Sequence, residues 1–247
     1  MVLLFALFWA ALASWRIRVL IRFFQLEEYQ SARYIRWLVA SRHRAVPDRF
    51  LLGATAGFAV AGILLVVGLD AAALHLPVWL VAGAVIAWPE PAKEVKKRFV
   101  ATQRATRLLV TAWAVAILWH VGFGILVASQ TDAVNATTLE IVALAGLAGY
   151  VLAPLALPVA NVLMYPVEET FRRGFREKAR RRLARARPLS IIGITGSYGK
   201  TSTKDYIAHL LSGRHKVLAT PKSYNTLMGV CITINNNLDP DGGYEYF

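Results

Sequence analysis

The chain has little cysteine and, over long stretches, no charged residue. Cys231 is the only cysteine among 247 residues, which excludes a disulfide framework and a cysteine-based metal cluster. Its apolar neighbours predict a buried thiol. Hydrophobic residues make up 56% of the chain, and most of this excess precedes residue 166. The composition indicates a membrane part followed by a smaller soluble part.

Four apolar segments approach the length of about 20 residues that a helix needs to cross the hydrocarbon core of a bilayer. They lie at 50–69, 71–88, 108–128 and 141–164, and the last is expected to kink at Pro154 and Pro158. A fifth, shorter candidate lies at 1–15, and snorkelling by Arg16 and Arg18 would lengthen it. No basic residue precedes it, which argues against a cleaved signal peptide.

Lys and Arg are missing from two of the connecting segments, around Asp70 and at 129–140. They are dense in the other three, 16–49, 93–107 and 172–187. By the positive-inside rule, this alternation predicts five spans with the amino terminus outside and the soluble part in the cytoplasm. We interpret most of the net charge of +13 as a signal for topology and for an anionic inner leaflet, rather than for nucleic acid.

No Asp, Glu, Lys or Arg lies near the middle of a predicted span, so the spans carry no signal for an ion pathway. His75 and His120 fall toward the predicted outer side. A proton or metal site is one interpretation, and histidines that face water or a partner helix are the favoured one. Asn135 begins a glycosylation sequon, but we expect no glycosylation in a chain of bacterial character. Small residues at 53–57 and 145–149 favour close helix packing, which suits an anchor.

The soluble part begins with a phosphate-binding pattern. The segment 189–195 (LSIIGIT) is apolar and β-branched, which predicts a buried parallel strand. A glycine-punctuated turn follows at 196–199, and the spacing of 200–212 predicts a helix. Strand, glycine loop and helix in this order are the context of a P-loop, whose backbone N–H groups bind phosphates. Lys200 is suited to the terminal phosphates and Thr201 to Mg²⁺.

The rest of the soluble part predicts an incomplete sheet. A short strand is expected at 216–219, a polar loop at 220–229 leads into the apolar segment 230–234, and 244–247 begins a third strand. A doubly wound sheet is not complete with two strands and the start of a third. The chain is therefore expected to be an amino-terminal fragment of a longer protein.

The expected fold has three parts. An α-helical multi-pass membrane domain occupies 1–165, and a basic amphipathic linker helix occupies 166–188 and lies on the inner leaflet. The start of an α/β P-loop domain, truncated, occupies 189–247.

The loop and the segment after the second strand resemble the Mur ligase family, the ATP-dependent amide-bond ligases of peptidoglycan precursor synthesis. The first motif is GITGSYGKT at 193–201, which, like the family's loop, lacks glycine at Ile194 and has Thr-Gly before x-x-Gly-Lys-Thr. The second is Thr220-Pro with YNTLMGV at 224–230, closest in form to the D-alanyl-D-alanine-adding branch. A weaker third motif at 243–247 is similar to the strand that leads to the family's magnesium-binding glutamate.

The resemblance implies a set of site residues. ATP and Mg²⁺ would bind at the loop, with Lys200 acting on the transferred phosphoryl group and Thr201 ligating the metal. Asn225 and Thr226 would face the substrate or the phosphates. The implied nucleotide-binding residues are Thr195, Gly196, Ser197, Tyr198, Gly199, Lys200, Thr201 and Ser202.

Three neighbouring residues receive weaker assignments. Thr203 and Lys204 are expected to be ordinary helix residues. The family's glutamate is expected just past Phe247 rather than at Glu245.

The resemblance also implies a reaction. Phosphate transfer from ATP to a carboxylate gives an acyl phosphate, and an amine then displaces phosphate to form an amide. The implied substrates are a UDP-MurNAc-tripeptide and D-Ala-D-Ala, at the inner (cytoplasmic) membrane of a bacterium, with the cell-wall synthesis machinery as a further partner. The fragment itself is not expected to catalyse ligation.

Other functions stay open because the membrane part stands where soluble ligases carry the domain that reads the uridine nucleotide. One is a ligase for another acceptor, such as a poly-γ-glutamate chain or a modified peptidoglycan peptide. The others are a catalytically degenerate membrane scaffold and a transporter or signalling protein driven by a P-loop.

Overall fold

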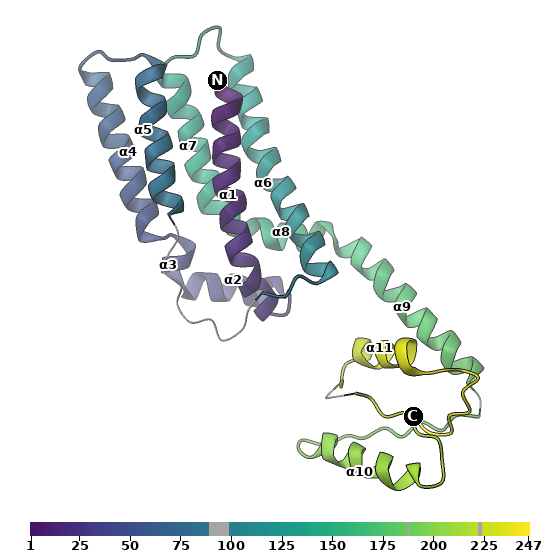
Figure 1. Ribbon diagram of the computed structural model, residues 1–247. Coiled ribbons are helices and arrows are strands. Elements are labelled where there is room, and N and C mark those ends of the chain that lie inside the picture. Colours follow the sequence, from purple (N-terminus) through teal and green to yellow (C-terminus); the bar gives the residue numbers. More distant parts are fainter. Residues whose placement is uncertain (89–98, 187, 222–223) are drawn as a thin grey trace. The chain divides into compact units, whose positions relative to one another are not determined.

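The computed structural model describes residues 1–88, 99–186, 188–221 and 224–247. Contacts within the chain divide it into two compact units, Met1–Tyr165 and Pro166–Phe247, which we call the amino-terminal and carboxy-terminal units. The amino-terminal unit is a bundle of helices, and the carboxy-terminal unit combines helices with extended segments (Figure 1).

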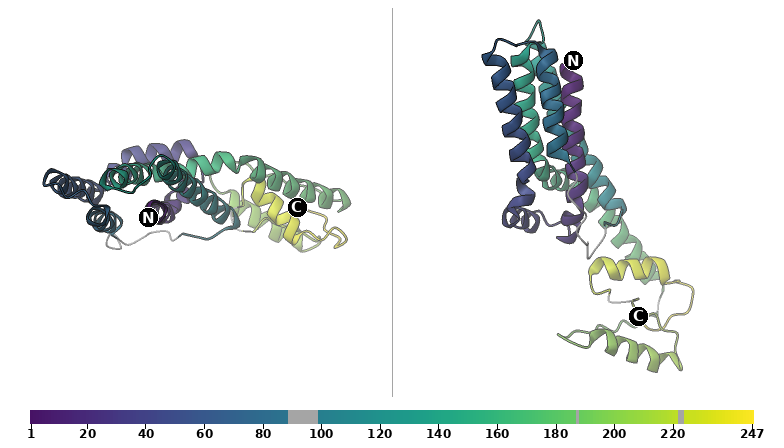
Figure 2. Two further views of the ribbon diagram at one scale, coloured as in Figure 1. Left: turned by 90° about the horizontal axis from the view of Figure 1, so that it is seen from above. Right: turned by 60° about the vertical axis from the view of Figure 1, so that its left-hand side comes forward.

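The amino-terminal unit is built around α1, which packs against α5, α6, α7 and α8 (Figure 2). The last helix of the hairpin α4–α5 also packs on α7. The helices in chain order are α1 (Val2–Leu26), α2 (Ser31–Ala40), α3 (Arg42–Ala45), α4 (Asp48–Val66), α5 (Ala72–Ala87), α6 (Gln103–Ser129), α7 (Ala136–Leu152), the 3₁₀ turn η1 (Ala153–Leu155) and α8 (Ala156–Leu163).

Among the described residues, four helical stretches rather than five are long and apolar enough to cross a membrane: Val2–Leu26, Asp48–Val66, Gln103–Ser129 and Ala136–Leu163. The segment 1–15, expected to be short, belongs to a helix of 25 residues. The segment 71–88 yields a helix of only 16 residues. This helix ends next to Trp88, which precedes a proline in the sequence, and that position disfavours helical backbone.

The first helix continues past its apolar half because Arg16 has internal partners. Its guanidinium is buried and donates to the carbonyl oxygens of Tyr150 (2.6 Å), Arg44 (2.9 Å) and Ala45 (2.6 Å). The expectation that Arg16 snorkels to the bilayer surface was therefore wrong. Arg18, by contrast, is exposed.

The predicted break at Pro154 is confirmed, whereas Pro158 lies inside the helix α8. The α-helix stops at Leu152, a 3₁₀ turn over Ala153–Leu155 contains Pro154, and α8 resumes at Ala156. Proline lacks the N–H that an α-helix needs at this point, and a 3₁₀ turn accommodates the break.

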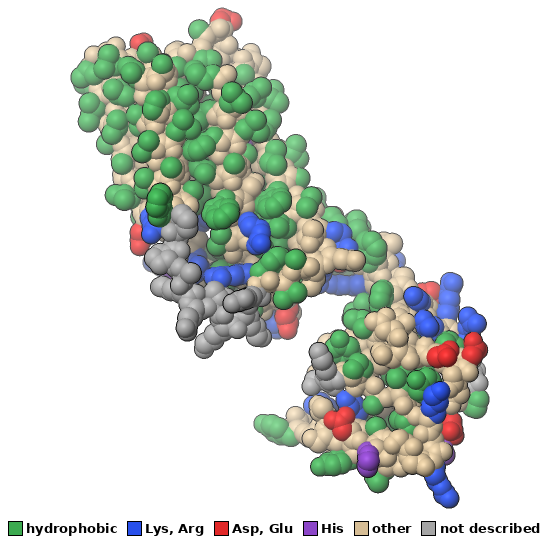
Figure 3. All heavy atoms as spheres, in the orientation of Figure 1, with side chains coloured by type: hydrophobic (Ala, Val, Ile, Leu, Met, Phe, Trp, Pro, Cys, Tyr) green, Lys and Arg blue, Asp and Glu red, His purple; other side chains and the backbone are tan. Residues whose placement is uncertain are grey.

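Small residues do allow close packing, as predicted. A Cβ atom at Gly57 of α4 would lie 2.8 Å from the indole of Trp79 on α5, and one at Gly146 of α7 would meet the indole of Trp9 on α1. Hydrophobic side chains cover most of the visible bundle surface, and Lys and Arg side chains gather at its lower end (Figure 3). This distribution suits the predicted orientation, which stays a prediction.

The carboxy-terminal unit contains all but the first residue of α9 (Tyr165–Arg185), together with α10 (Lys200–Ser212) and α11 (Leu227–Asn237). The helix predicted at 200–212 is confirmed with the same bounds. The helix α11 was missed, since the sequence was interpreted only as a loop that leads into an apolar segment. Its first turn is capped by Thr226, whose hydroxyl accepts a hydrogen bond from the Gly229 N–H at 3.1 Å.

The three predicted strands meet, but within the described residues they form isolated parallel bridges rather than a ladder. Tyr246 bridges both Ser190 and Val217, so the last segment lies between the other two. Hydrogen bonds from Ser190 N to Glu245 O (2.8 Å) and from Leu218 N to Tyr246 O (2.9 Å) fix this order. The expected burial of the first strand was wrong, because Ile191 is 63% exposed.

A small core holds this unit together. It contains Ala179 and Ala186 near the end of α9, and Cys231, Ile234 and Leu238 from α11 and the residue after it. The prediction that Cys231 is buried is confirmed. Arg182 of α9 donates to the carbonyl oxygens at the end of α11, which ties the two helices. The extended segments lie between α11 and α10 (Figures 1 and 2).

Candidate functional site

A pocket of about 540 Å³ brings the two sequence motifs together. The glycine loop contributes Thr195, Gly196, Lys200 and Thr201, and the second motif contributes Tyr224 and Asn225. The helix α10 and the segment 217–220 form further walls. Five predicted residues do not line the pocket, and these are Ser197, Tyr198, Gly199, Ser202 and Thr226.

The loop geometry requires glycine where the helix begins. Gly199 is the N-cap of α10 and has a φ of 75°, in the left-handed region that side chains with a Cβ atom rarely adopt. Its carbonyl oxygen accepts the first helical hydrogen bond, from Thr203 N at 2.9 Å. The free N–H groups of the first turn therefore lie beside Lys200 and Thr201, at the positive end of a 13-residue helix.

Two lysines of α10 line the pocket and are held differently. The Lys200 ammonium folds back and donates to the Gly196 carbonyl oxygen inside the loop. The Lys204 ammonium donates to the Thr220 carbonyl oxygen at 2.7 Å and pairs with Asp205 at 3.2 Å. Lys204 was expected to be an ordinary helix residue, but it ties the helix to the start of the second motif.

The two predicted substrate-facing residues separate into different roles. Thr226 uses its hydroxyl to cap α11, as described above. Asn225 is exposed, lines the pocket, and makes no side-chain hydrogen bond within the described part of the chain. Tyr224 packs over Gly229, where a Cβ atom would lie 3.1 Å from the tyrosine Cβ. The pocket thus contains Asn225, whose predicted role toward substrate stays a prediction, and Tyr224, which the sequence did not single out.

Glu245 lies outside this pocket and is engaged elsewhere. Its Oε2 contacts the His215 Nδ1 at 2.9 Å, and its Oε1 accepts from the Lys216 N–H at 3.4 Å. The hydrogen bond from His215 lowers the pKa of the Glu245 carboxyl below its ordinary value. This geometry agrees with the preference against Glu245 as a metal ligand.

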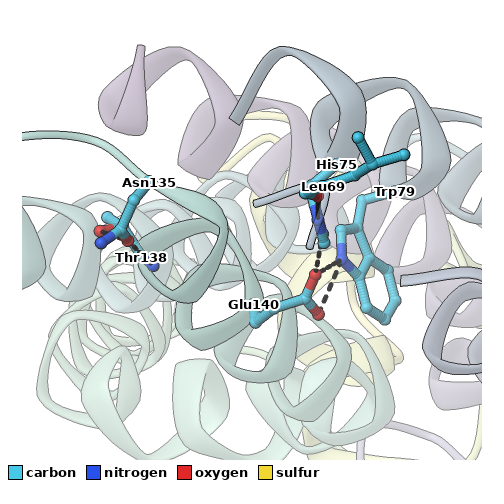
Figure 4. Close-up of polar contacts among 6 residues, drawn as sticks. All are labelled: Leu69, His75, Trp79, Asn135, Thr138 and Glu140. Atoms are coloured by element: carbon cyan, nitrogen blue, oxygen red, sulfur yellow. Dashed lines mark hydrogen bonds and ion pairs between the residues drawn. The ribbon is translucent and has the colours of Figure 1, made fainter. Parts of the chain in front are cut away.

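His75 and His120 are both buried in the bundle, and Figure 4 shows the partners of His75. His75 Nε2 lies 3.0 Å from the Leu69 carbonyl oxygen and Nδ1 lies 2.9 Å from Glu140 Oε1. Trp79 Nε1 donates to both oxygens of Glu140 at 3.1 Å. Because a carbonyl oxygen only accepts, Nε2 is the donor in the contact with Leu69.

His120 and Asn135 also have structural partners. His120 Nδ1 lies 2.7 Å from the Ala116 carbonyl oxygen of its own helix, and its ring packs on Gly149. Asn135 caps α7 by accepting from the Thr138 N–H and hydroxyl, each at 2.9 Å. Among the described residues, no group of three His, Cys, Asp or Glu side chains is placed to hold a metal ion.

Comparison with known proteins places one family in this region. Residues 194–246 match the Mur ligase middle domain. The UDP-N-acetylmuramoyl-tripeptide–D-alanyl-D-alanine ligases of Mycobacterium leprae and Mycobacterium tuberculosis are 56% identical over 41 residues, which are 17% of this chain and 8% of each relative. The chain thus spans a small part of these relatives. No solved structure matches.

Proposed function

We propose that the intact protein is an ATP-dependent carbon–nitrogen ligase of cell-wall precursor synthesis, anchored in the bacterial inner membrane by the amino-terminal unit. The observation that carries this proposal is the pocket that unites both motifs within the segment matching the Mur ligase middle domain. The four long apolar helices support the anchor. The basic helix α9 supports contact with an anionic inner leaflet.

The residues of the pocket fit the phosphates of a nucleotide. The volume lies within the range of roughly 300–1,000 Å³ that is usual for small-molecule sites. N–H groups at the start of α10 would bind phosphate oxygens, and Lys200 would turn from Gly196 toward the terminal phosphate. The Thr201 hydroxyl, on the same turn, would ligate Mg²⁺, whose charge stabilises the transferred phosphoryl group.

The proposed substrates are taken from the names of the similar relatives. We propose a UDP-MurNAc-tripeptide as carboxylate donor and D-Ala-D-Ala as amine. Phosphorylation of the carboxylate supplies a leaving group, and attack by the amine releases phosphate and forms the amide. Asn225, with no internal hydrogen-bond partner among the described residues, would orient one of these substrates at the pocket mouth.

The test is phosphate release by the intact protein in lipid nanodiscs, with ATP, Mg²⁺ and the two proposed substrates. Release should depend on both substrates and fall by about 100-fold or more in Lys200→Ala, since one positioned charge contributes on that order. The control Lys178→Ala removes an exposed lysine of α9 and should have no effect. Release that needs neither substrate would contradict the proposal, and release with a different carboxylate would redirect it.

A further inference from the structure

Arginines gather around aromatic rings where α1 meets α3. The guanidinium carbons of Arg22 and Arg44 lie 4.5 Å and 4.8 Å from the centroid of the same Phe23 ring. Arg18, one turn before Arg22, lies 4.9 Å above Phe99. Stacking on an aromatic face stabilises a cation only modestly at a partly exposed position.

These cations have no acidic partner within the described residues. The ion pair closest in sequence, Arg33 with Glu28 at 3.2 Å, involves neither Arg22 nor Arg44. Both guanidinium groups stack on one ring, so they are separated by no more than about one Debye length at physiological salt. Two like charges held this close repel each other unless a counter-ion lies between them.

The cluster is held in place by buried groups. The Arg16 guanidinium binds the backbone oxygens of Arg44 and Ala45, which fixes α3 against α1. Phe23 also stacks on Trp37 of α2, with ring centroids 4.5 Å apart and an interplanar angle of 17°. The positions of the cations are therefore set by packing rather than by a ligand, as a preorganised site requires.

One donor of the cluster lacks an acceptor. Arg22 Nε is shielded from solvent and has no hydrogen-bond partner in the described part of the chain. A buried donor without an acceptor is unfavourable. An anion with several oxygens would satisfy the guanidinium groups and offset their repulsion.

The same face of α1 offers apolar surface next to the cations. Trp15 and Val19 are 53% and 40% exposed, and with Arg22 they follow the i, i+4, i+7 spacing of one helix face. A ligand with a negative head and apolar chains would contact both parts of this face. A small phosphate would use only the arginines.

We propose that Arg18, Arg22 and Arg44 form a specific site for the phosphate group of an anionic phospholipid, with the acyl chains along Trp15 and Val19. This site rests on the membrane anchoring proposed above, but not on nucleotide binding or ligation. It differs from general attraction of a basic surface to the inner leaflet, because it is localised to side chains from two helices.

The test compares lipids by native mass spectrometry of the intact protein in detergent. Phosphatidylglycerol should bind in preference to phosphatidylcholine with the same chains, and the double variant Arg22→Gln/Arg44→Gln should weaken binding about tenfold, as expected for losing charge-assisted hydrogen bonds. The control Arg36→Gln/Arg42→Gln removes the same charge from exposed positions nearby and should change the binding of phosphatidylglycerol little. Circular dichroism checks that each variant keeps its helix content.

Three results would overturn the site. Equal binding of both lipids would show no headgroup preference, and equal weakening in the control pair would show general electrostatics. Full competition by inorganic phosphate would show a free-phosphate site instead of a lipid site. Release of the unaltered protein from membranes by alkaline carbonate would refute the membrane anchoring itself. This extraction experiment therefore distinguishes failure of the lipid site from failure of the anchor.

Discussion

Arg16 and His75 of the amino-terminal unit are enclosed, whereas Tyr198 and Asn225 of the carboxy-terminal unit are exposed. Arg16 donates to three carbonyl oxygens, and His75 lies between a carbonyl oxygen and Glu140. In the glycine loop, by contrast, Tyr198 is 95% exposed, and Asn225 lines a pocket. The enclosed groups hold helices together, whereas the open ones are available to a ligand. The difference separates structural polar residues from those that we assign to function.

Among the substitutions that test this difference between enclosed and exposed polar residues, the largest effect is expected at Arg16. Arg16→Met leaves three carbonyl oxygens without their donor and should lower the free energy of unfolding by about 3 kcal/mol. Unfolding in mixed micelles by titration with a denaturing detergent measures this loss. Arg36→Met, at an exposed position, is the control. A loss no larger than that of the control would mean that Arg16 is not an internal structural group.

A smaller effect is expected from the pair on α5 and α7. A double-mutant cycle with His75→Gln and Glu140→Gln should give a coupling free energy of about 1–2 kcal/mol in the same unfolding experiment. Asp132→Asn, at an exposed position nearby, should be neutral. Additive effects of the two substitutions would mean that the pair does not hold the helices together.

The next prediction concerns the carboxy-terminal unit and the N-cap of its helix α11. Thr226→Ala removes the acceptor for the Gly229 N–H and should destabilise this unit by about 1 kcal/mol, while Thr226→Ser should retain most of the stability. Hydrogen exchange of the α11 amides measures the change locally. If alanine and serine behave alike, the hydroxyl does not act as a cap, and its predicted role toward substrate would gain support.

The smallest effect concerns Glu245, whose pair with His215 is exposed. Its folded-state pKa is lowered by the hydrogen bond from His215, so the pair stabilises above the ordinary glutamate pKa of about 4.3. That contribution is lost as the pH falls through the folded pKa. Thermal midpoints of the unaltered protein and Glu245→Gln should differ near neutral pH and converge in acid. If the difference in thermal midpoint stays the same at all pH values, the ionised Glu245 carboxylate does not stabilise the fold through His215.

The helices were predictable where hydropathy or capping gives a local signal. The helix at 200–212 follows from spacing, and the 3₁₀ break follows from Pro154. The missed helix α11 had such a signal, because Thr226 precedes apolar residues at 227, 230, 231 and 234, which is helical spacing. The length of α1 was not predictable, since it depends on carbonyl partners that lie far away in the sequence.

The extended segments and the pocket depended on contacts between distant residues. A parallel strand is buried only when neighbouring strands and helices cover it. The apolar run at 189–195 predicted a buried strand, but the described residues of this unit do not cover it. The sequence did identify Lys200, Thr201 and Asn225, which the fold brings to one pocket. It gave no signal for Lys204, because its link to Thr220 exists only once α10 lies beside that segment.

Hydrogen–deuterium exchange of the intact protein, with and without Mg²⁺ and a non-hydrolysable ATP analogue, tests the central claim most directly. We expect slower exchange at 194–204 and at 220–226 together, and no change in the bundle helices. Protection should disappear in Lys200→Ala and persist in Lys178→Ala. Unchanged exchange in both motifs, or protection of only one of them, would contradict a single nucleotide pocket built from both.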